Sequence, residues 1–186
     1  MVFLIPFGAI VVVALVGLLS YNRFVRQRQL IANAWANVDT ELKRRYDLIP
    51  NLVEVVKGYA AHERATLEEV IAARSAAFAA QGSPAEKAGT ENVLADGLRR
   101  MMALAEAYPQ ILADQHFLGL QNELITTENR IQAARRLYNG NVRDYNTRVE
   151  SFPSMLIARM GNFLRAEFFE IDSVMRAAAP PAATFS

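Results

Sequence analysis

Two histidines, His62 and His116, are the first candidates for chemistry, because imidazole serves both as a metal ligand and as a general base. A di-iron site in a helical bundle requires a Glu-x-x-His pair on each of two helices. Tyr59 and Ala113 stand three residues before the histidines, so neither pair exists. His62-Glu63 also lacks the second histidine of a zinc-protease helix. The chain has no cysteine, which excludes thiol catalysis and iron–sulfur ligation.

Other reactive patterns are also absent from the sequence. It contains neither a Gly-x-Ser-x-Gly elbow nor a glycine-rich phosphate loop. Methionines that could ligate haem recur at helical spacing, which indicates packing; they are Met101, Met102, Met155 and Met160. The 20 basic and 19 acidic residues give a net charge of +1, which argues against a nucleic-acid partner. We therefore predict a protein that is not an enzyme and that binds no metal or cofactor.

Polar residues inside otherwise apolar helical patterns are better candidates for a site. They are Asp39, Arg44, Arg45, Glu128, Asn129, Arg130 and Arg135. One interpretation is a buried polar network that binds a small ligand. The other is a set of ion pairs that fixes the register between helices. We favour the ion pairs, because an unpaired charge inside a protein is too unfavourable to be incidental.

Helices must position these residues, because apolar side chains recur at steps of three or four through most of the chain. The first such series is Ile31, Trp35, Val38 and Leu42. Pro50 lacks an N–H and restricts the residue before it, so we expect the first helix to end near Tyr46. A second helix is then expected over residues 50–80.

The later part of the chain repeats this pattern. We expect a helix over residues 90–108 that is capped by Thr90, and a long helix that is capped by Asp114 and ends before Pro153. A short helix is expected over residues 154–165. No strand pattern persists. The apolar stripes must be hidden together, which predicts an all-α fold, an antiparallel up-and-down bundle of about four long helices plus a short C-terminal helix.

The segment from Val2 to Leu19 contains no charged residue. As a helix, it would span roughly 27 Å, near the thickness of the hydrocarbon core of a bilayer. We predict a retained transmembrane anchor, continuous with the first bundle helix, in preference to a cleaved signal peptide or a buried helix. The predicted domains are an anchor at residues 1–21, a bundle at 22–165 and a tail at 166–186, mostly disordered after about residue 177.

Residues that follow the apolar segment suggest an orientation. Tyr21 stands where an interfacial aromatic residue belongs, and Arg23, Arg26 and Arg28 come directly after it. This excess of positive charge predicts a cytoplasmic bundle and an N-terminus outside the membrane.

Aromatic residues near the C-terminus are candidates for an interface. Phe163, Leu164, Phe168 and Phe169 must be buried, and we rank the bundle end first, a neighbouring subunit second and the bilayer interface third. Tyr138 and Tyr145, seven residues apart, fit either the core or a subunit interface.

Motifs spread over about residues 20–170 carry a family resemblance. They include Ala34-Trp35-Ala36, Asp47-Leu48-Ile49-Pro50-Asn51-Leu52-Val53, Glu106-Ala107-Tyr108-Pro109 and Thr127-Glu128-Asn129-Arg130-Ile131. In this order they resemble the LemA family of bacterial membrane-anchored helical proteins. The resemblance implies an all-helical domain behind one membrane span, without an established enzymatic activity. Some relatives are associated with building internal membrane compartments.

These observations lead to a functional hypothesis. We expect a single-pass protein of the bacterial inner membrane whose bundle self-assembles as a homo-oligomer at the lipid bilayer and acts as a scaffold or membrane-organising factor. An alternative is an accessory or adaptor subunit that docks on another membrane protein, such as a protease or a signalling system. A third hypothesis is an enzyme or a ligand-binding bundle with a pocket near Asp39 or Glu128.

Overall fold

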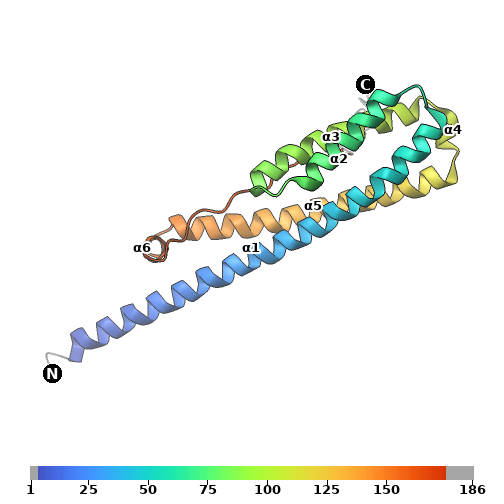
Figure 1. Cartoon of the computed structure of the whole chain (residues 1–186). Helices are drawn as coiled ribbons and strands as arrows, with labels where there is room; N and C mark the ends of the chain where they lie inside the picture. Colours follow the sequence, from blue (N-terminus) through green and yellow to red (C-terminus); the bar gives the residue numbers. More distant parts are fainter. Residues whose placement is uncertain (1–3, 175–186) are drawn as a thin grey trace, which may run out of the picture. The chain divides into compact units, whose positions relative to one another are not determined.

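The computed structural model describes residues 4–174, with side chains described for residue 12 and residues 14–174. Its helices are α1 (Leu4–Tyr59), α2 (Arg64–Ala79), α3 (Pro84–Glu106), α4 (Pro109–Leu112), α5 (Gln115–Glu150) and α6 (Ser154–Met160), drawn in Figure 1. No strand occurs over residues 4–174. The predicted all-α class is therefore confirmed.

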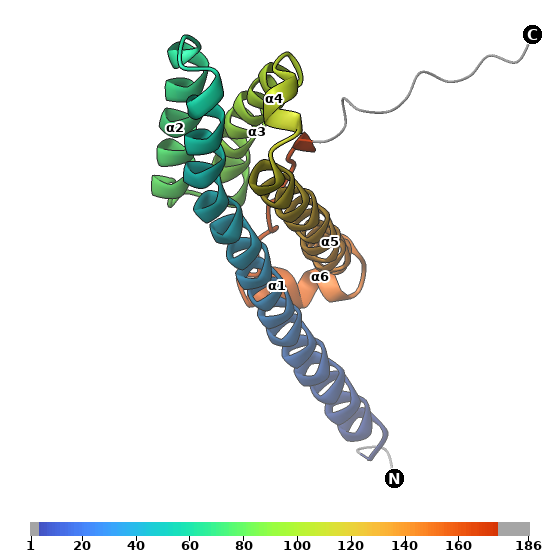
Figure 2. The same ribbon diagram turned by 90° about the vertical axis from the view of Figure 1, so that its right-hand side faces the viewer.

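The chain divides into two compact units, and the long helices α1 and α5 contribute to both. Unit 1 consists of Met1–Asn37 and Arg136–Phe168, and unit 2 consists of Val38–Arg135 and Phe169–Ser186. Unit 2 contains α2 and α3, which lie side by side in Figure 2. Buried alanines such as Ala77 on α2 and Ala95 on α3 allow these two helices to pack closely.

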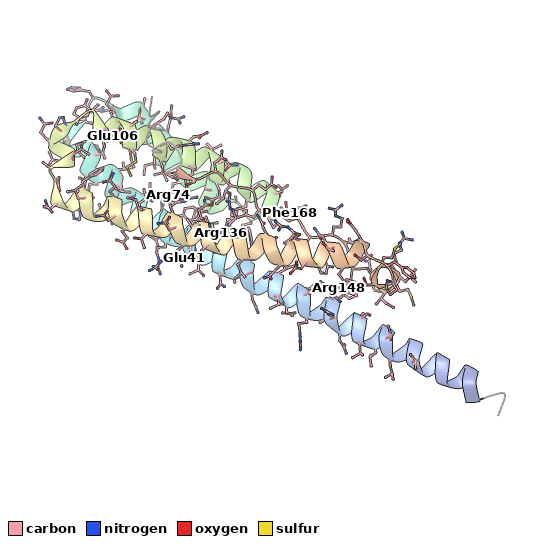
Figure 3. The ribbon with its side chains drawn as sticks, turned by 180° about the vertical axis from the view of Figure 1, so that it is seen from behind. Glu41, Arg74, Glu106, Arg136, Arg148 and Phe168 are labelled. Carbon is pink, nitrogen blue, oxygen red and sulfur yellow. The ribbon has the colours of Figure 1, made fainter. Side chains whose placement is uncertain are left out.

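The predicted break at Pro50 is wrong, because α1 continues through it to Tyr59. A proline leaves the carbonyl four residues earlier without its helical donor, and here that carbonyl belongs to Tyr46. The Nε of Arg74, which Figure 3 labels on α2, donates to the Tyr46 carbonyl oxygen at 2.6 Å. A side chain from another helix therefore replaces the missing hydrogen bond, and the first turn of the chain comes only after Tyr59.

The start of α3 also differs from the prediction. Ser83 accepts a hydrogen bond from the backbone N–H of Glu86, and the Glu86 side chain accepts one from the backbone N–H of Ser83. This capping box, with Pro84 in the first turn, begins the helix six residues before Thr90. The predicted cap on the long helix is confirmed, because Asp114 accepts from the N–H groups of His116 and Phe117.

Helix α6 is shorter than predicted and ends at Met160. Asn162 adopts a positive φ of 51°, and the N–H of Phe163 donates to the Ala158 carbonyl at 2.9 Å. The N–H of Asn162 also donates to the Arg159 carbonyl, which completes a Schellman motif. The motif reverses the chain, and residues 163–173 then run without a helix.

The N-terminal and C-terminal predictions lie partly beyond what is described. Over the described residues, no helix has both the length and the apolar character that crossing a bilayer requires. The predicted anchor at residues 1–21 begins outside these residues, and the side chains of residues 4–11 and 13 are also not described. The predicted disorder after about residue 177 lies outside the described residues, which end at Val174.

Candidate functional site

Four polar residues meet in the interior of unit 2, and we call them the ionic core. Helix α1 supplies Arg45 and Tyr46, α3 supplies Glu91, and α5 supplies Glu128. Arg45 and Glu91 are 0 % exposed, Tyr46 is 1 % exposed and Glu128 is 2 % exposed. Charged side chains are rarely so deeply buried unless they are paired, so the contacts among them decide what the cluster does.

Arg45 is the centre of the ionic core. Its Nη1 donates to Oε1 of Glu128 at 2.7 Å, and its Nη2 donates to Oε2 of Glu91. The hydroxyl of Tyr46 donates to the other carboxylate oxygen of Glu91. One guanidinium group thus bridges three helices, with two carboxylates around it and a hydroxyl that shares the negative charge of one of them.

The protonation states follow from burial and from these partners. Burial lowers the pKa of Arg45, but the Glu128 and Glu91 carboxylates outweigh it and raise the pKa above its usual value. Burial, followed by the Glu91 charge, raises the pKa of the Tyr46 hydroxyl well above its usual range. Arg45 is therefore charged and Tyr46 is a neutral donor at any physiological pH.

A second group of charges lies at the edge of the ionic core. Asp39 accepts from Lys43 at 2.7 Å, one turn along α1, and from Lys87 on α3 at 3.0 Å. Burial raises the pKa of Asp39, but the hydrogen bonds from Lys43 and Lys87 prevail and hold it below its usual value. Lys87 is 8 % exposed, so this pair adds a second, partly buried link between α1 and α3.

The remaining polar candidates do not join the ionic core. Arg44 lies 3.7 Å from Glu41 on the surface of α1. Asn129 and Arg130 are exposed on α5. Arg135 donates to the carbonyl oxygen of Ile171, which ties the segment after α6 to α5 within unit 2.

Sequence reasoning missed Glu91, Tyr46 and Lys87. Glu91 follows the predicted cap Thr90 and continues the apolar stripe of Leu94 and Leu98 at steps of three and four. A carboxylate on the buried face of a helix is the signal that would have identified it, because such a position requires a cation.

Aromatic residues form the interior of unit 1. The rings of Phe24 and Phe163 stack with centroids 4.8 Å apart, and Tyr145 meets Phe24 edge-on at 6.1 Å. We call Phe24, Tyr145 and Phe163, together with Ala158, the aromatic core. Tyr145 is 3 % exposed, so it faces the interior of unit 1.

Other predicted interface residues surround this core. The Tyr21 ring lies 5.3 Å from the Phe163 ring, and the guanidinium of Arg28 lies 6.0 Å above the latter. Tyr138, 2 % exposed, packs on Trp35 and donates to the Glu167 carbonyl at 2.8 Å.

The last candidates differ in exposure. Arg23 and Arg26 are exposed on α1. The prediction that Leu164 is buried is wrong, because its side chain is 72 % exposed. Phe168 is partly buried in unit 1, whereas Phe169 is buried in unit 2. The segment after α6 therefore packs at least as far as Val174, which is also buried.

The arrangement favours structural roles over chemistry. The charges of the ionic core are directed at each other, and a carboxylate already bound by a buried guanidinium is a poor ligand for a cation. Neither histidine, both of which are exposed, forms part of it. Residues 4–174 contain no group of three or more histidine, aspartate or glutamate side chains that could hold a metal ion.

Comparisons with known proteins agree with the motifs. The model of the LemA family matches residues 34–185. The chain is 26 % identical to magnetosome protein MamQ of Magnetospirillum gryphiswaldense and 25 % identical to magnetosome protein MamQ 1 of Paramagnetospirillum magneticum. Each match covers 82 % of this chain and 65 % of the relative, so the chain spans just under two thirds of these proteins. Protein LemA of Metamycoplasma hominis is 23 % identical over 83 % of this chain and 71 % of that protein.

Proposed function

The chain belongs to the LemA family, and from this premise we propose that it is a non-enzymatic, single-pass membrane protein whose helical bundle self-assembles as a scaffold on the bilayer. The continuity of α1 carries the proposal. One helix extends from Leu4, inside the apolar segment, to Tyr59, beyond the ionic core. No break in the helix separates the apolar segment from the aromatic core of unit 1.

The apolar segment supports the anchor. Residues 2–19 carry no charge. Where side chains are described, large apolar residues of α1 are exposed; they are Val12, Leu15, Val16, Leu18 and Leu19. Such a surface on a helix is unfavourable in water and favourable in lipid. Arg23, Arg26 and Arg28 follow it and favour a bundle on the cytoplasmic side of a bacterial inner membrane, with the N-terminus outside.

The ionic core supports a rigid scaffold over a catalyst. A guanidinium that binds carboxylates from two other helices fixes the mutual register of α1, α3 and α5. Confinement to a membrane raises the effective concentration of such rigid bodies, so weak lateral contacts suffice for assembly. The relatives named magnetosome proteins fit a role in organising membranes.

The assembly state of the full-length protein tests this proposal. After extraction in mild detergent and after crosslinking in the membrane, we expect homo-oligomers in light scattering and in electron microscopy. A chain that lacks residues 1–20 should dissociate to monomers at the same concentration, because it loses the confinement. A strictly monomeric full-length protein would refute the scaffold.

Orientation is tested separately. A protease added to right-side-out vesicles should spare the bundle and cut it only after the vesicles are opened. Cleavage in closed vesicles would place the bundle on the opposite side and would overturn the proposed orientation.

A further inference from the structure

Four large apolar side chains are exposed at steps of four around α6. Phe152 is 78 % exposed, Leu156 49 %, Met160 85 % and Leu164 72 %. We call these four residues the α6 edge. Leu156 and Met160 share one face of the helix because they lie one turn apart. So many large apolar groups within thirteen residues of a chain exceed the scattered exposure that a soluble surface usually shows.

Ile157, next to the α6 edge on the helix, and Phe163, just after the helix, fix the position of α6 along α1 within unit 1. A Cβ atom at Gly17 would lie 3.7 Å from Cδ1 of Ile157. One turn later, Tyr21 and Phe24 contact Phe163. Helix α6 therefore lies level with residues 17–24 of α1, where the apolar segment ends and the arginines begin. A bilayer that contained the segment would have its surface at this level.

Positive charge accompanies the α6 edge. Arg159 and Arg165 line a surface cavity of about 480 Å³ whose apolar wall includes Val149, Met155 and Phe163. Glu150 also lines it and pairs with Arg165 at 2.9 Å, between side chains that are both more than half exposed, so this pairing is weak. A cavity with cationic and apolar walls matches a phospholipid, which has a phosphate next to acyl chains.

Other arginines of unit 1 add to the positive charge near α6. Burial and then the charge of Arg23 lower the pKa of the Arg148 guanidinium, so the positive charges of α1 and α5 crowd each other in unit 1. Arg148 lies on the last turns of α5, as Figure 3 shows. An anionic surface would relieve this repulsion.

We propose that the α6 edge inserts into the bilayer interface beside the anchor, with Arg159 and Arg165 binding the phosphates of anionic phospholipids. This inference rests on the proposed anchor, because the anchor sets the level of the membrane. It adds a second attachment point, which fixes the rotation of α1 about its own axis relative to the membrane. The Schellman turn at Asn162 fixes the direction in which the chain leaves α6 towards Leu164.

Single-cysteine labelling tests the insertion, because the natural chain contains no cysteine. We would attach an environment-sensitive fluorophore to full-length Met160→Cys, Leu15→Cys and Val93→Cys and reconstitute each protein in vesicles of equal parts phosphatidylcholine and phosphatidylglycerol. Leu15 reports on the anchor, and Val93, 59 % exposed on α3, is the matched control in unit 2. A spin-labelled lipid then quenches any fluorophore that lies in the bilayer.

The outcomes separate the two proposals. Quenching and a blue shift at positions 15 and 160, without quenching at 93, are expected. Quenching at 15 alone would overturn the insertion of α6 and leave the anchor intact, whereas quenching at neither would refute both. A blue shift at 160 without quenching by lipid would mean that protein covers the edge, which also overturns the inference.

The arginines provide a second test. Arg159→Gln or Arg165→Gln in the Met160→Cys protein should lower the ratio of inserted to free α6 about fivefold each, as expected for one basic residue at an anionic surface. Arg143→Gln, at an exposed arginine about two turns before the end of α5, is the control. Vesicles of phosphatidylcholine alone should abolish the difference. Equal effects of all three substitutions would overturn the role of phosphate binding.

Discussion

The two units of this chain join their helices through different kinds of contact. Unit 2 joins its helices through a buried guanidinium, two carboxylates and a phenol, whereas unit 1 joins α1, α5 and the turn after α6 through packed aromatic rings. The charged contacts are directional and mutually dependent, because removing one partner leaves the others buried without a counter-charge. The aromatic contacts are individually replaceable, since each ring contributes mainly through the area that it buries.

The comparison teaches how specificity and stability are divided. Buried charges add little net stability over apolar residues of the same size, but they strongly disfavour any register in which they are unpaired. Unit 2 therefore holds its helices in one register through paired charges, whereas unit 1 depends mainly on the burial of aromatic rings. Each of the following changes acts on one unit and is measured as the free energy of unfolding of the full-length protein in mild detergent, followed by helical circular dichroism.

The largest effect is expected for Arg45→Met. It leaves Glu91 and Glu128 buried without their cation, so we expect a loss of about 3–5 kcal/mol. Arg44→Met is the matched control, because that side chain is 46 % exposed and should change stability by less than about 0.5 kcal/mol. Replacing all three ionic residues by Met or Leu should recover most of the loss. If Arg45→Met alone lowered the free energy of unfolding as little as Arg44→Met, the contrast drawn between the two units would be wrong.

Phe24→Ala tests the aromatic core. The ring is 0 % exposed and packs on Phe163 and Tyr145, so its removal should cost about 3 kcal/mol through lost burial and a cavity. Val25→Ala, at an exposed neighbour on the same helix, is the control. Unlike the charged case, Phe24→Leu should recover about half of the loss without any second substitution. Equal losses for Leu and Ala would contradict that expectation.

Tyr138→Phe should remove about 1 kcal/mol, because it deletes the hydrogen bond to the Glu167 carbonyl but retains the ring. Burial, and then the Glu167 charge, raise the pKa of Tyr138 from 10.0 to about 12. The folded state binds this proton more tightly than the unfolded state, so its contribution is present below pH 10 and is lost as the pH rises towards 12. The Phe variant should lose less stability over that interval, and parallel curves would exclude this cause.

The smallest effect is expected for Asp39→Asn, about 0.5 kcal/mol near neutral pH, because the pairs with Lys43 and Lys87 are partly exposed. The pKa of Asp39 is lowered in the folded state from 3.8. Its contribution is therefore present above pH 3.8 and is lost as the pH falls through the folded value. Acid titration of the Asn variant should be flatter below pH 3.8, and a slope equal to that of the natural chain would contradict this expectation.

Periodicity was sufficient to predict the helical class and most of the elements. It failed where a distant residue decides the outcome. Pro50 predicts a break from local backbone chemistry, but the helix continues, and the Arg74 side chain, 24 positions further along the chain, supplies the missing donor. The start of α3 was misplaced for a local reason, because Ser83-Pro84 with Glu86 is a stronger capping signal than Thr90.

The sequence predicted only part of the candidate site. Arg45 and Glu128 stood out because each interrupts an apolar pattern, but the pattern does not state which charges meet. Glu91 completes the set from a helix whose beginning had been misplaced, so its buried face was not recognised. Positions on one helix follow from spacing, whereas pairing across helices follows from tertiary packing.

The hydrogen bond from Arg74 to the Tyr46 carbonyl also imposes an order of events. The segment around Pro50 is synthesised before Arg74. Until Arg74 donates to the Tyr46 carbonyl, the helix lacks one hydrogen bond at this point. We expect the last turns of α1 to gain stability when α2 docks, because the Arg74 side chain then supplies the missing donor. We therefore expect the hydrogen bond between Arg74 and the Tyr46 carbonyl to form late, after the rest of α1 is helical.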